Sequence, residues 1–312
     1  MERLPTSSEI RSLFANSNPD EVWAKAFDVV GRISPAYDLS LARTTFDDII
    51  RLFHGEYPGY CAIKTLYHDL SHTLDVFLCA VRLAHGIHIS GSPLTADEIT
   101  QIMIAALMHD IGYAQRHSED NGTGAQHTRD HVRRGIEFMN CYLAERSFPS
   151  AWAASLESMM LTTNHMGEFH DINFPDERAR LLGQIIATAD LVGQMSDRTY
   201  LEKLLFLYLE FKEANLGNYL SMLDLLRKTE IFYEFTRQKK LDGDLESLYE
   251  KLTFHFKDYF GTERNYYLES LERNMDYLSQ AIRLDEAECL SMLKRGGIVE
   301  KAKVLGVPDE TT

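Results

Sequence analysis

Histidine and aspartate residues recur on the apolar faces of separate predicted helices, where such side chains need partners. The positions are His68, His72, His109, Asp110, His131, Asp190 and, near a predicted helix end, His165. Burying so many ionisable groups alone would cost roughly several kcal/mol each. Bound metal removes that cost, because neutral imidazoles and carboxylates are metal ligands. The pattern therefore predicts one or two divalent ions, with Mn, Mg, Zn, Fe and Co as candidates.

The adjacent pair His109 and Asp110 is the most specific of these features. An apolar stripe with a period of about 3.6 residues precedes the pair and directs it toward the core. An imidazole and a carboxylate side by side allow one ion to take the nitrogen while the carboxylate bridges to a second ion. We expect His72 and Asp190 to supply the remaining protein ligands of the first ion.

His68 precedes His72 by four residues, so both imidazoles are expected to point from one helix face into the same space. Two interpretations remain open for His68. Such a pair can supply two ligands to one ion, or His68 can stand apart from the metal as a proton donor. Asp75, about one turn beyond His72, is expected to hold an imidazole in the tautomer that the site needs.

Helices must position these residues, because the sequence shows almost no strand pattern. Residues 176–307 contain no proline and are rich in Leu, Glu, Lys and Tyr, which is typical of long helices. Thr95 and Glu98 form a capping box at one predicted helix start. The predicted class is all-α, with helices at about 61–84, 95–110, 127–145, 151–163 and 178–195.

Composition limits the class of protein. The 312 residues carry 47 acidic and 32 basic side chains, a net charge of −15, which argues against nucleic-acid binding by counterion release. The longest apolar run, 102–108, is far shorter than the ~20 residues of a membrane span, and the first residues lack a signal-peptide core. We therefore expect a cytoplasmic protein without membrane association. The four cysteines are widely spaced and are expected to be reduced and mostly buried.

Three sequence segments together resemble the HD-domain metal-dependent phosphohydrolase superfamily. They are YHDLSHTLDV at 67–76, AALMHDIG at 105–112 and ADL at 189–191. The closest similarity in motif is to the class I cyclic nucleotide phosphodiesterases, whose first motif has the form Y-H-N-x-x-H-x-x-D-V. The resemblance covers about residues 60–200 and implies a helical bundle around a metal site.

The resemblance assigns a role to each matching residue. It implies that the tight metal is held by His72, His109, Asp110 and Asp190, with Asp110 bridging to a second ion. His68 matches the histidine that protonates the leaving alkoxide. Two further residues, His131 and His165, match histidines that many HD proteins use on the second metal. His127, one turn before His131, competes for the same role.

The sequence departs from the family pattern at two positions near these motifs. Asp69 replaces the usual Asn, and Tyr113 stands where phosphodiesterases have a supporting His and many other HD hydrolases have Lys. We expect Tyr113 to support the site from beside the ligands. The glutamine with which cyclic nucleotide enzymes hold the purine has no clear counterpart after Asp190, so a cyclic nucleotide is only one candidate substrate.

The expected organisation is a single unit in three parts. Residues 1–58 form N-terminal helices that pack on the core, 59–200 form the HD metal-binding core, and 201–312 form C-terminal helices that complete the unit. For this last part a cavity wall, a lid and a dimer surface all remain open.

The expected function is that of a metal-dependent phosphohydrolase, in which a metal-activated water attacks a phosphodiester or a nucleotide phosphoester. The expected partner is a small-molecule phosphoester, with no nucleic acid and no membrane, and a homo-oligomer is compatible with the sequence. One alternative is a di-iron oxygenase of the HD type, such as inositol oxygenase, and another is a metal-bound ligand-sensing module without turnover. His68 favours hydrolysis, because an oxygenase has no leaving alkoxide to protonate.

Overall fold

The computed structural model of the chain is all-α, as predicted, and describes residues 6–14, 16–164, 166–217 and 219–306. Within these ranges no strand is formed, and the one isolated bridge of β type joins Tyr60 to Arg116. Also within these ranges, no helix is long and apolar enough to cross a membrane.

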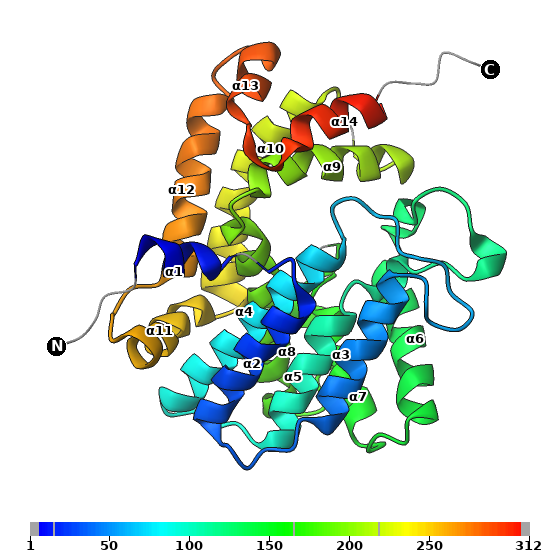
Figure 1. Cartoon of the computed structure of the whole chain (residues 1–312), viewed down its shortest axis with the longest axis vertical. Coiled ribbons are helices and arrows are strands. Elements are labelled where there is room, and N and C mark those ends of the chain that lie inside the picture. Colours follow the sequence, from blue (N-terminus) through cyan, green and yellow to red (C-terminus); the bar gives the residue numbers. More distant parts are fainter. Residues whose placement is uncertain (1–5, 15, 165, 218, 307–312) are drawn as a thin grey trace.

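Helices of the first two thirds of the chain pack into one bundle, which occupies the lower part of Figure 1. A short α1 precedes them at Ser7–Ser12. The bundle helices are α2 (Pro19–Ile33), α3 (Ser40–Phe53), α4 (Leu70–Ile89), α5 (Ala96–Met108), α6 (His131–Glu145), α7 (Trp152–Leu161) and α8 (Glu177–Ser196).

Helices α4 and α8 form the centre of this bundle. Each has 20 residues, and they pack side by side, with α2, α5 and α11 also against α4 and with α7 and α12 also against α8. Apolar side chains lie on every side of α4, from Leu74 to Ile87, as expected for a helix that is covered all round. Gly193 of α8 lies against α4, where an added Cβ would meet the Asp75 carbonyl oxygen at 3.4 Å. The site residues on α4 and α8 are therefore carried by the most rigidly packed elements.

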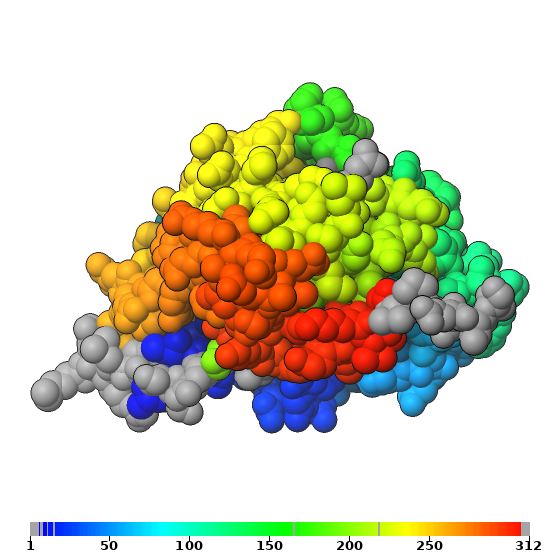
Figure 2. All heavy atoms as spheres, turned by 90° about the horizontal axis from the view of Figure 1, so that it is seen from above, coloured from blue at the N-terminus to red at the C-terminus, as the bar shows by residue number. Residues whose placement is uncertain are grey.

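The last third of the chain covers the bundle. Figure 2 shows the face formed by these C-terminal helices, and α14 packs along α9. The elements are α9 (Tyr200–Glu213), α10 (Met222–Phe235), a π-helical turn (Thr236–Asp244), α11 (Leu252–Phe260), α12 (Tyr266–Ala281), α13 (Glu286–Met292) and α14 (Ile298–Gly306). Several helices fill the segment that lacks proline, and glycines at positive φ lie at two of the breaks between them, Gly217 (71°) and Gly261 (68°).

The capping box at the start of α5 is confirmed. Thr95 Oγ1 accepts the Glu98 backbone N–H at 3.3 Å, and the Glu98 carboxylate accepts the Thr95 backbone N–H at 2.7 Å. The helix then ends at Met108, and His109 is its C-cap residue. The cap thus fixes the register that brings His109 and Asp110 to the buried end of α5.

The predicted start of the helix around His72 is wrong. The helix begins at Leu70 rather than near residue 61, because the Asp69 side chain accepts the His72 backbone N–H at 2.9 Å and acts as N-cap. His68 lies in the non-helical segment before this cap, so His68 and His72 do not share a helix face. The two imidazoles therefore lie near each other for a reason other than their separation by four residues on a helix.

The four cysteines are free, as expected, but they are less uniformly buried than predicted. Cys79 and Cys289 are buried, Cys61 is partly buried and Cys141 is exposed.

Candidate metal centre

Two imidazole nitrogens from different helices face one another at the centre of the candidate site. His72 Nε2 of α4 lies 3.2 Å from His109 Nε2 at the end of α5. Both side chains are almost fully buried. Within the described residues, His72, His109 and Asp110 form a group whose ligand atoms all lie within 4.8 Å of one another.

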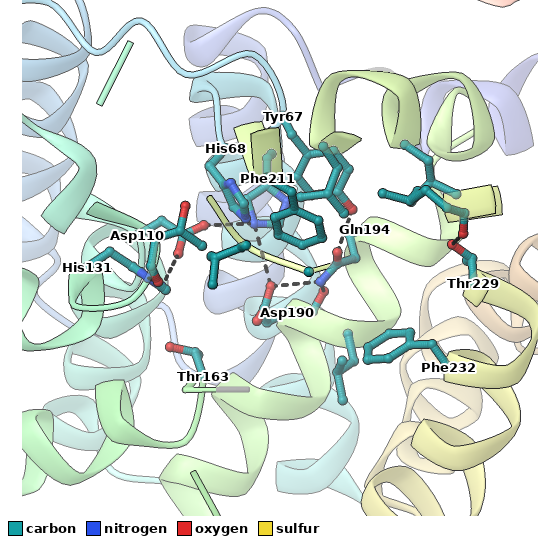
Figure 3. Close-up of a pocket in the computed structure, with 18 of the residues that line it drawn as sticks. Tyr67, His68, Asp110, His131, Thr163, Asp190, Gln194, Phe211, Thr229 and Phe232 are labelled. Carbon is teal, nitrogen blue, oxygen red and sulfur yellow. Dashed lines mark hydrogen bonds and ion pairs between the residues drawn. The ribbon is translucent and has the colours of Figure 1, made fainter. Parts of the chain in front are cut away.

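Asp110 brings its carboxylate to both sides of this group (Figure 3). Its Oδ2 atom lies 3.2 Å from His72 Nε2 and 3.1 Å from His109 Nε2. Its Oδ1 atom lies 3.4 Å from Nε2 of His131, at the first residue of α6. One carboxylate therefore separates a pair of imidazoles from a third imidazole, which is the arrangement that a bridging ligand requires.

The other ring nitrogens of two histidines donate to backbone carbonyls one turn earlier. His109 Nδ1 donates to the Ala106 oxygen at 2.9 Å, and His131 Nδ1 donates to the Thr128 oxygen at 2.8 Å. These bonds fix the tautomer that leaves Nε2 as the ligating atom. The structure therefore favours His131 over His127, whose Nδ1 lies 3.8 Å from Asp130 and which does not line the cavity.

Electrostatics in the metal-free chain fit a cation site. Burial lowers the pKa of His109, but the carboxylates of Asp110 and Asp190 outweigh burial and raise it to about 9. Burial raises the pKa of Asp110, but His109, His68 and His131 outweigh it, so this pKa lies well below its usual value. The site thus attracts positive charge into a buried volume, and a metal ion would take the place of the imidazole proton. Two imidazoles and two carboxylates are a donor set that fits Zn, Mn, Fe or Co.

Asp190 of α8 completes the group. Its Oδ1 atom lies 3.5 Å from His72 Nε2 and 3.8 Å from His109 Nε2. Gln194, one turn further along α8, donates from Nε2 to the same Oδ1 atom at 3.1 Å. Tyr67 in turn donates its hydroxyl to Gln194 Oε1 at 2.6 Å. This relay holds the Asp190 carboxylate toward the two imidazoles.

Sequence reasoning missed Gln194, although its position four residues after Asp190 on one helix face was a usable signal.

Gln194→Ala is expected to weaken divalent metal binding by about 10- to 100-fold, the usual effect of losing a residue that hydrogen-bonds to a metal ligand. Competition against a chromophoric chelator measures this affinity. Gln184→Ala is the matched control, because Gln184 is a buried glutamine on the same helix that bonds Asp244 and Glu246 instead. Equal affinities of the Gln194→Ala protein and the parent would contradict the relay.

His68 lies beside the metal ligands and is held by a residue that the sequence did not suggest. Its Nδ1 atom donates to Glu210 Oε2 of α9 at 2.6 Å, and Glu210 Oε1 accepts the Tyr67 backbone N–H at 2.6 Å. Burial lowers the pKa of His68, but Glu210, Asp110 and Asp190 outweigh it and raise that pKa to about 9. Because Nδ1 is bonded to Glu210, Nε2 is the ring nitrogen that can interact with a ligand in the cavity that His68 lines.

Tyr113 lies between two site histidines. Its ring stacks on His68 and on His131, with centroids 4.7 Å apart in both cases. The ring is fully buried, and its hydroxyl has no hydrogen-bond partner in the described part of the chain. Tyr113 therefore supports the site by packing between the two imidazoles.

Two expected site residues are not placed with the group. His165 lies outside the described residues. Asp75 does not hold an imidazole: it accepts from Asn16 Nδ2 at 2.8 Å and lies 4.0 Å from Lys203 Nζ. Lys203 is bound more closely, at 2.7 Å, by Asp197. Asp75 thus belongs to a separate buried charge cluster between α4 and α9.

Asp75→Asn is expected to raise the stability of the protein more at about pH 8 than at about pH 5. Burial and, to a lesser extent, the charge of Asp197 raise the pKa of Asp75 from 3.8 to about 7. Lys203 and the hydrogen bond from Asn16 lower this pKa, but by less. A carboxyl with a raised folded-state pKa contributes stability at low pH that is lost as the pH rises toward 7. Asparagine keeps the oxygen that accepts from Asn16 and carries no charge.

Urea unfolding of the Asp75→Asn and parent proteins at both pH values measures the difference. Asp97→Asn, on the exposed side of α5, serves as the control and should not change the pH dependence. Asp75→Asn should also keep its metal content, because Asp75 bonds none of the proposed ligands. A stability difference that shrinks from pH 5 to pH 8 would contradict this account.

A cavity of about 350 Å³ opens onto this group. His68, His72, Asp110, His131 and Asp190 line its inner end. Helices α9 and α10 supply most of its opposite wall, so part of the segment after residue 200 forms a cavity wall.

The fold and the site define an all-α protein with a buried His and Asp centre at the base of a cavity. The chain belongs to the Npun_R2479-like family, whose sequence model matches residues 42–251. The matched range includes His72, His109, Asp110 and Asp190, together with His68, Glu210 and both wall helices. Searches of curated proteins and of solved structures found no match.

Proposed function

We propose that this protein is a metal-dependent phosphohydrolase of the HD type. The observation that carries the proposal is the convergence of His72, His109, Asp110 and Asp190 on one buried point, with His131 at the second oxygen of Asp110. The order of these residues along the chain also agrees with the HD pattern. A divalent ion held there would lower the pKa of a bound water and neutralise phosphoryl oxygens.

The residues around the ligands support hydrolysis of a phosphoester. In the reaction the water oxygen forms a bond to phosphorus, the bond from phosphorus to the leaving oxygen breaks, and that oxygen needs a proton. His68 faces the cavity and is anchored by Glu210 through Nδ1, so its Nε2 proton is positioned for this donation. Water supplies the proton that His68 regains. A phosphodiester and water thus give an alcohol and a phosphomonoester, and a phosphomonoester and water give an alcohol and phosphate.

The test combines metal analysis with a substrate screen. Purified protein is stripped of metal, reloaded in turn with Mn, Mg, Zn, Fe or Co, and assayed on bis-p-nitrophenyl phosphate, cyclic nucleotides and nucleoside monophosphates. We expect hydrolysis that depends on metal and is lost with chelator. The same Fe-loaded sample is monitored for oxygen uptake, because uptake without hydrolysis would identify an oxygenase. Tight metal binding with neither activity would instead favour a sensing module.

A further inference from the structure

The cavity above the metal centre is polar at one end and apolar at the other. Figure 3 shows Asp110 and His131 on one side and Thr229 and Phe232 on the opposite side. Two helices contribute apolar side chains at helical spacing, which makes each stripe a continuous wall. They are Leu204, Leu207 and Phe211 of α9, and Leu225 and Phe232 of α10.

The glutamine in this cavity is already fully engaged. Gln194 Oε1 accepts from the Tyr67 hydroxyl, and Gln194 Nε2 donates to Asp190. Reading the edge of a nucleobase requires an amide that is available for two hydrogen bonds. Gln194 therefore does not serve as a purine-binding residue without giving up its support of Asp190.

Two polar side chains at the apolar end, Thr229 and Lys228, already have local partners. Thr229 donates its hydroxyl to the Leu225 carbonyl oxygen at 2.9 Å. Lys228 bonds Asp224 at 2.9 Å and lies over the Tyr219 ring, 4.9 Å from its centroid. Sugar hydroxyls placed against the apolar stripes of α9 and α10 would lose water without gaining partners, at a cost of about 1–3 kcal/mol for each unpaired group.

Apolar residues also line the opening of the cavity. Phe232 and Met166 both line it and are exposed, at 42% and 67%. Phe235, about one turn after Phe232 on α10, is exposed as well, at 51%. Large apolar side chains left in water around a cavity mark a surface that receives an apolar group.

We propose that the substrate is a phosphoester whose organic group is uncharged and apolar, an ester of a hydrophobic alcohol, rather than a nucleotide. The phosphoester part of this inference rests on the proposed function. The apolar part rests on the α9 and α10 walls and on the engaged polar groups. The phosphoryl group would lie at the His and Asp end, and the apolar chain would extend between the two helices toward Phe232.

Alkyl p-nitrophenyl phosphodiesters test the inference, because the leaving group stays constant while the chain grows. Methyl, butyl and octyl esters are compared, below their aggregation concentrations, with thymidine 5′-(p-nitrophenyl phosphate). Each buried methylene contributes about 0.8 kcal/mol, so kcat/KM should rise about 30-fold or more from methyl to butyl. The thymidine ester should be hydrolysed less efficiently than the butyl ester.

Two variants of α10 locate the effect in the cavity. Phe232→Asp places a charge in the lining and should lower the ratio of octyl to methyl kcat/KM by about tenfold or more, given the value of burying apolar side chains. Ile231→Asp is the matched control, because Ile231 is exposed on the same helix and does not line the cavity. It should leave the ratio unchanged.

The outcomes separate this inference from the proposed function. Metal-dependent hydrolysis whose kcat/KM does not depend on chain length, or is higher for the thymidine ester, would overturn the inference. It would still support the proposed hydrolase function. If no ester is hydrolysed with any metal, the proposed function fails, and calorimetry with butyl and octyl phosphonate still tests the cavity. Tighter binding of the octyl compound, weakened by Phe232→Asp, would support an apolar ligand, whereas equal affinities would overturn it.

Discussion

The Asp110→Ala protein is expected to contain no tightly bound metal and to hydrolyse phosphoesters about 10³-fold more slowly, or slower still. Asp110 is the residue that contacts three imidazoles, at 3.1 to 3.4 Å, so its loss removes a ligand and also the charge that draws a cation into the site. Metal ions contribute several kcal/mol to phosphoryl transfer, and each 1.36 kcal/mol is tenfold in rate. Asp110→Asn keeps the shape of the side chain and should act in the same direction.

Metal content by mass spectrometry and thermal melting distinguish this effect from unfolding. A ligand that binds the folded state raises the melting temperature, so added metal should stabilise the parent protein and not the Asp110 variants. Asp258→Asn is the control. Asp258 also lies near an imidazole, 3.7 Å from His85 Nε2, but it pairs with Arg32 and, among the described residues, contacts no proposed metal ligand. An Asp110→Ala protein that retains metal and full activity would exclude this centre.

The convergence of the proposed ligands could be predicted because local patterns determine where these side chains point. Asp110 follows an apolar stripe whose register is fixed by the Thr95 and Glu98 cap, and Asp190 continues the stripe of α8. The helical period relates residues that are near one another in sequence, so it indicates reliably which of them lie on the same face of a helix. The same reasoning gave the all-α class.

Partners from distant parts of the chain could not be predicted in this way. Glu210 lies 142 residues from His68, and Asn16 lies 59 residues from Asp75. Neither spacing leaves a periodic trace, so the sequence pattern pairs Asp75 with an imidazole and does not indicate Glu210. Tertiary contacts of this kind depend on how α9 and the N-terminal segment pack against α4.

One local signal, the N-cap residue Asp69, marks the start of α4 in the sequence. Asp69 is a strong N-cap residue, and its departure from the Asn of the phosphodiesterase motif preserves this capacity, since both side chains cap helices well. The apolar residues before it extend the stripe of α4 and hide the boundary. Correct use of the cap places His68 outside the helix, where Glu210 can hold both its imidazole and the backbone N–H of Tyr67.

His68→Ala is expected to lower kcat by about 10²- to 10⁴-fold while leaving metal content unchanged. The loss should depend on the leaving group. A p-nitrophenolate leaves readily without a proton, so its ester should lose little, whereas an ester of an aliphatic alcohol should lose the full factor. His127→Ala is the control, because this histidine is near in sequence to His131 but does not line the cavity. Equal losses for both esters, or loss of metal together with activity, would contradict a proton-donating role.

Glu210→Gln is expected to change how His68 works without removing it. An amide in place of the carboxylate keeps one oxygen, which can still accept the Tyr67 backbone N–H, but it replaces the oxygen that faces His68 Nδ1 and removes the charge that raises the pKa of His68. A proton donor loses activity as the pH rises through its pKa, so the alkaline limb of the kcat profile should move to lower pH. Because a purely structural role of Glu210 would lower kcat equally at every pH, the movement of this limb is the decisive measurement.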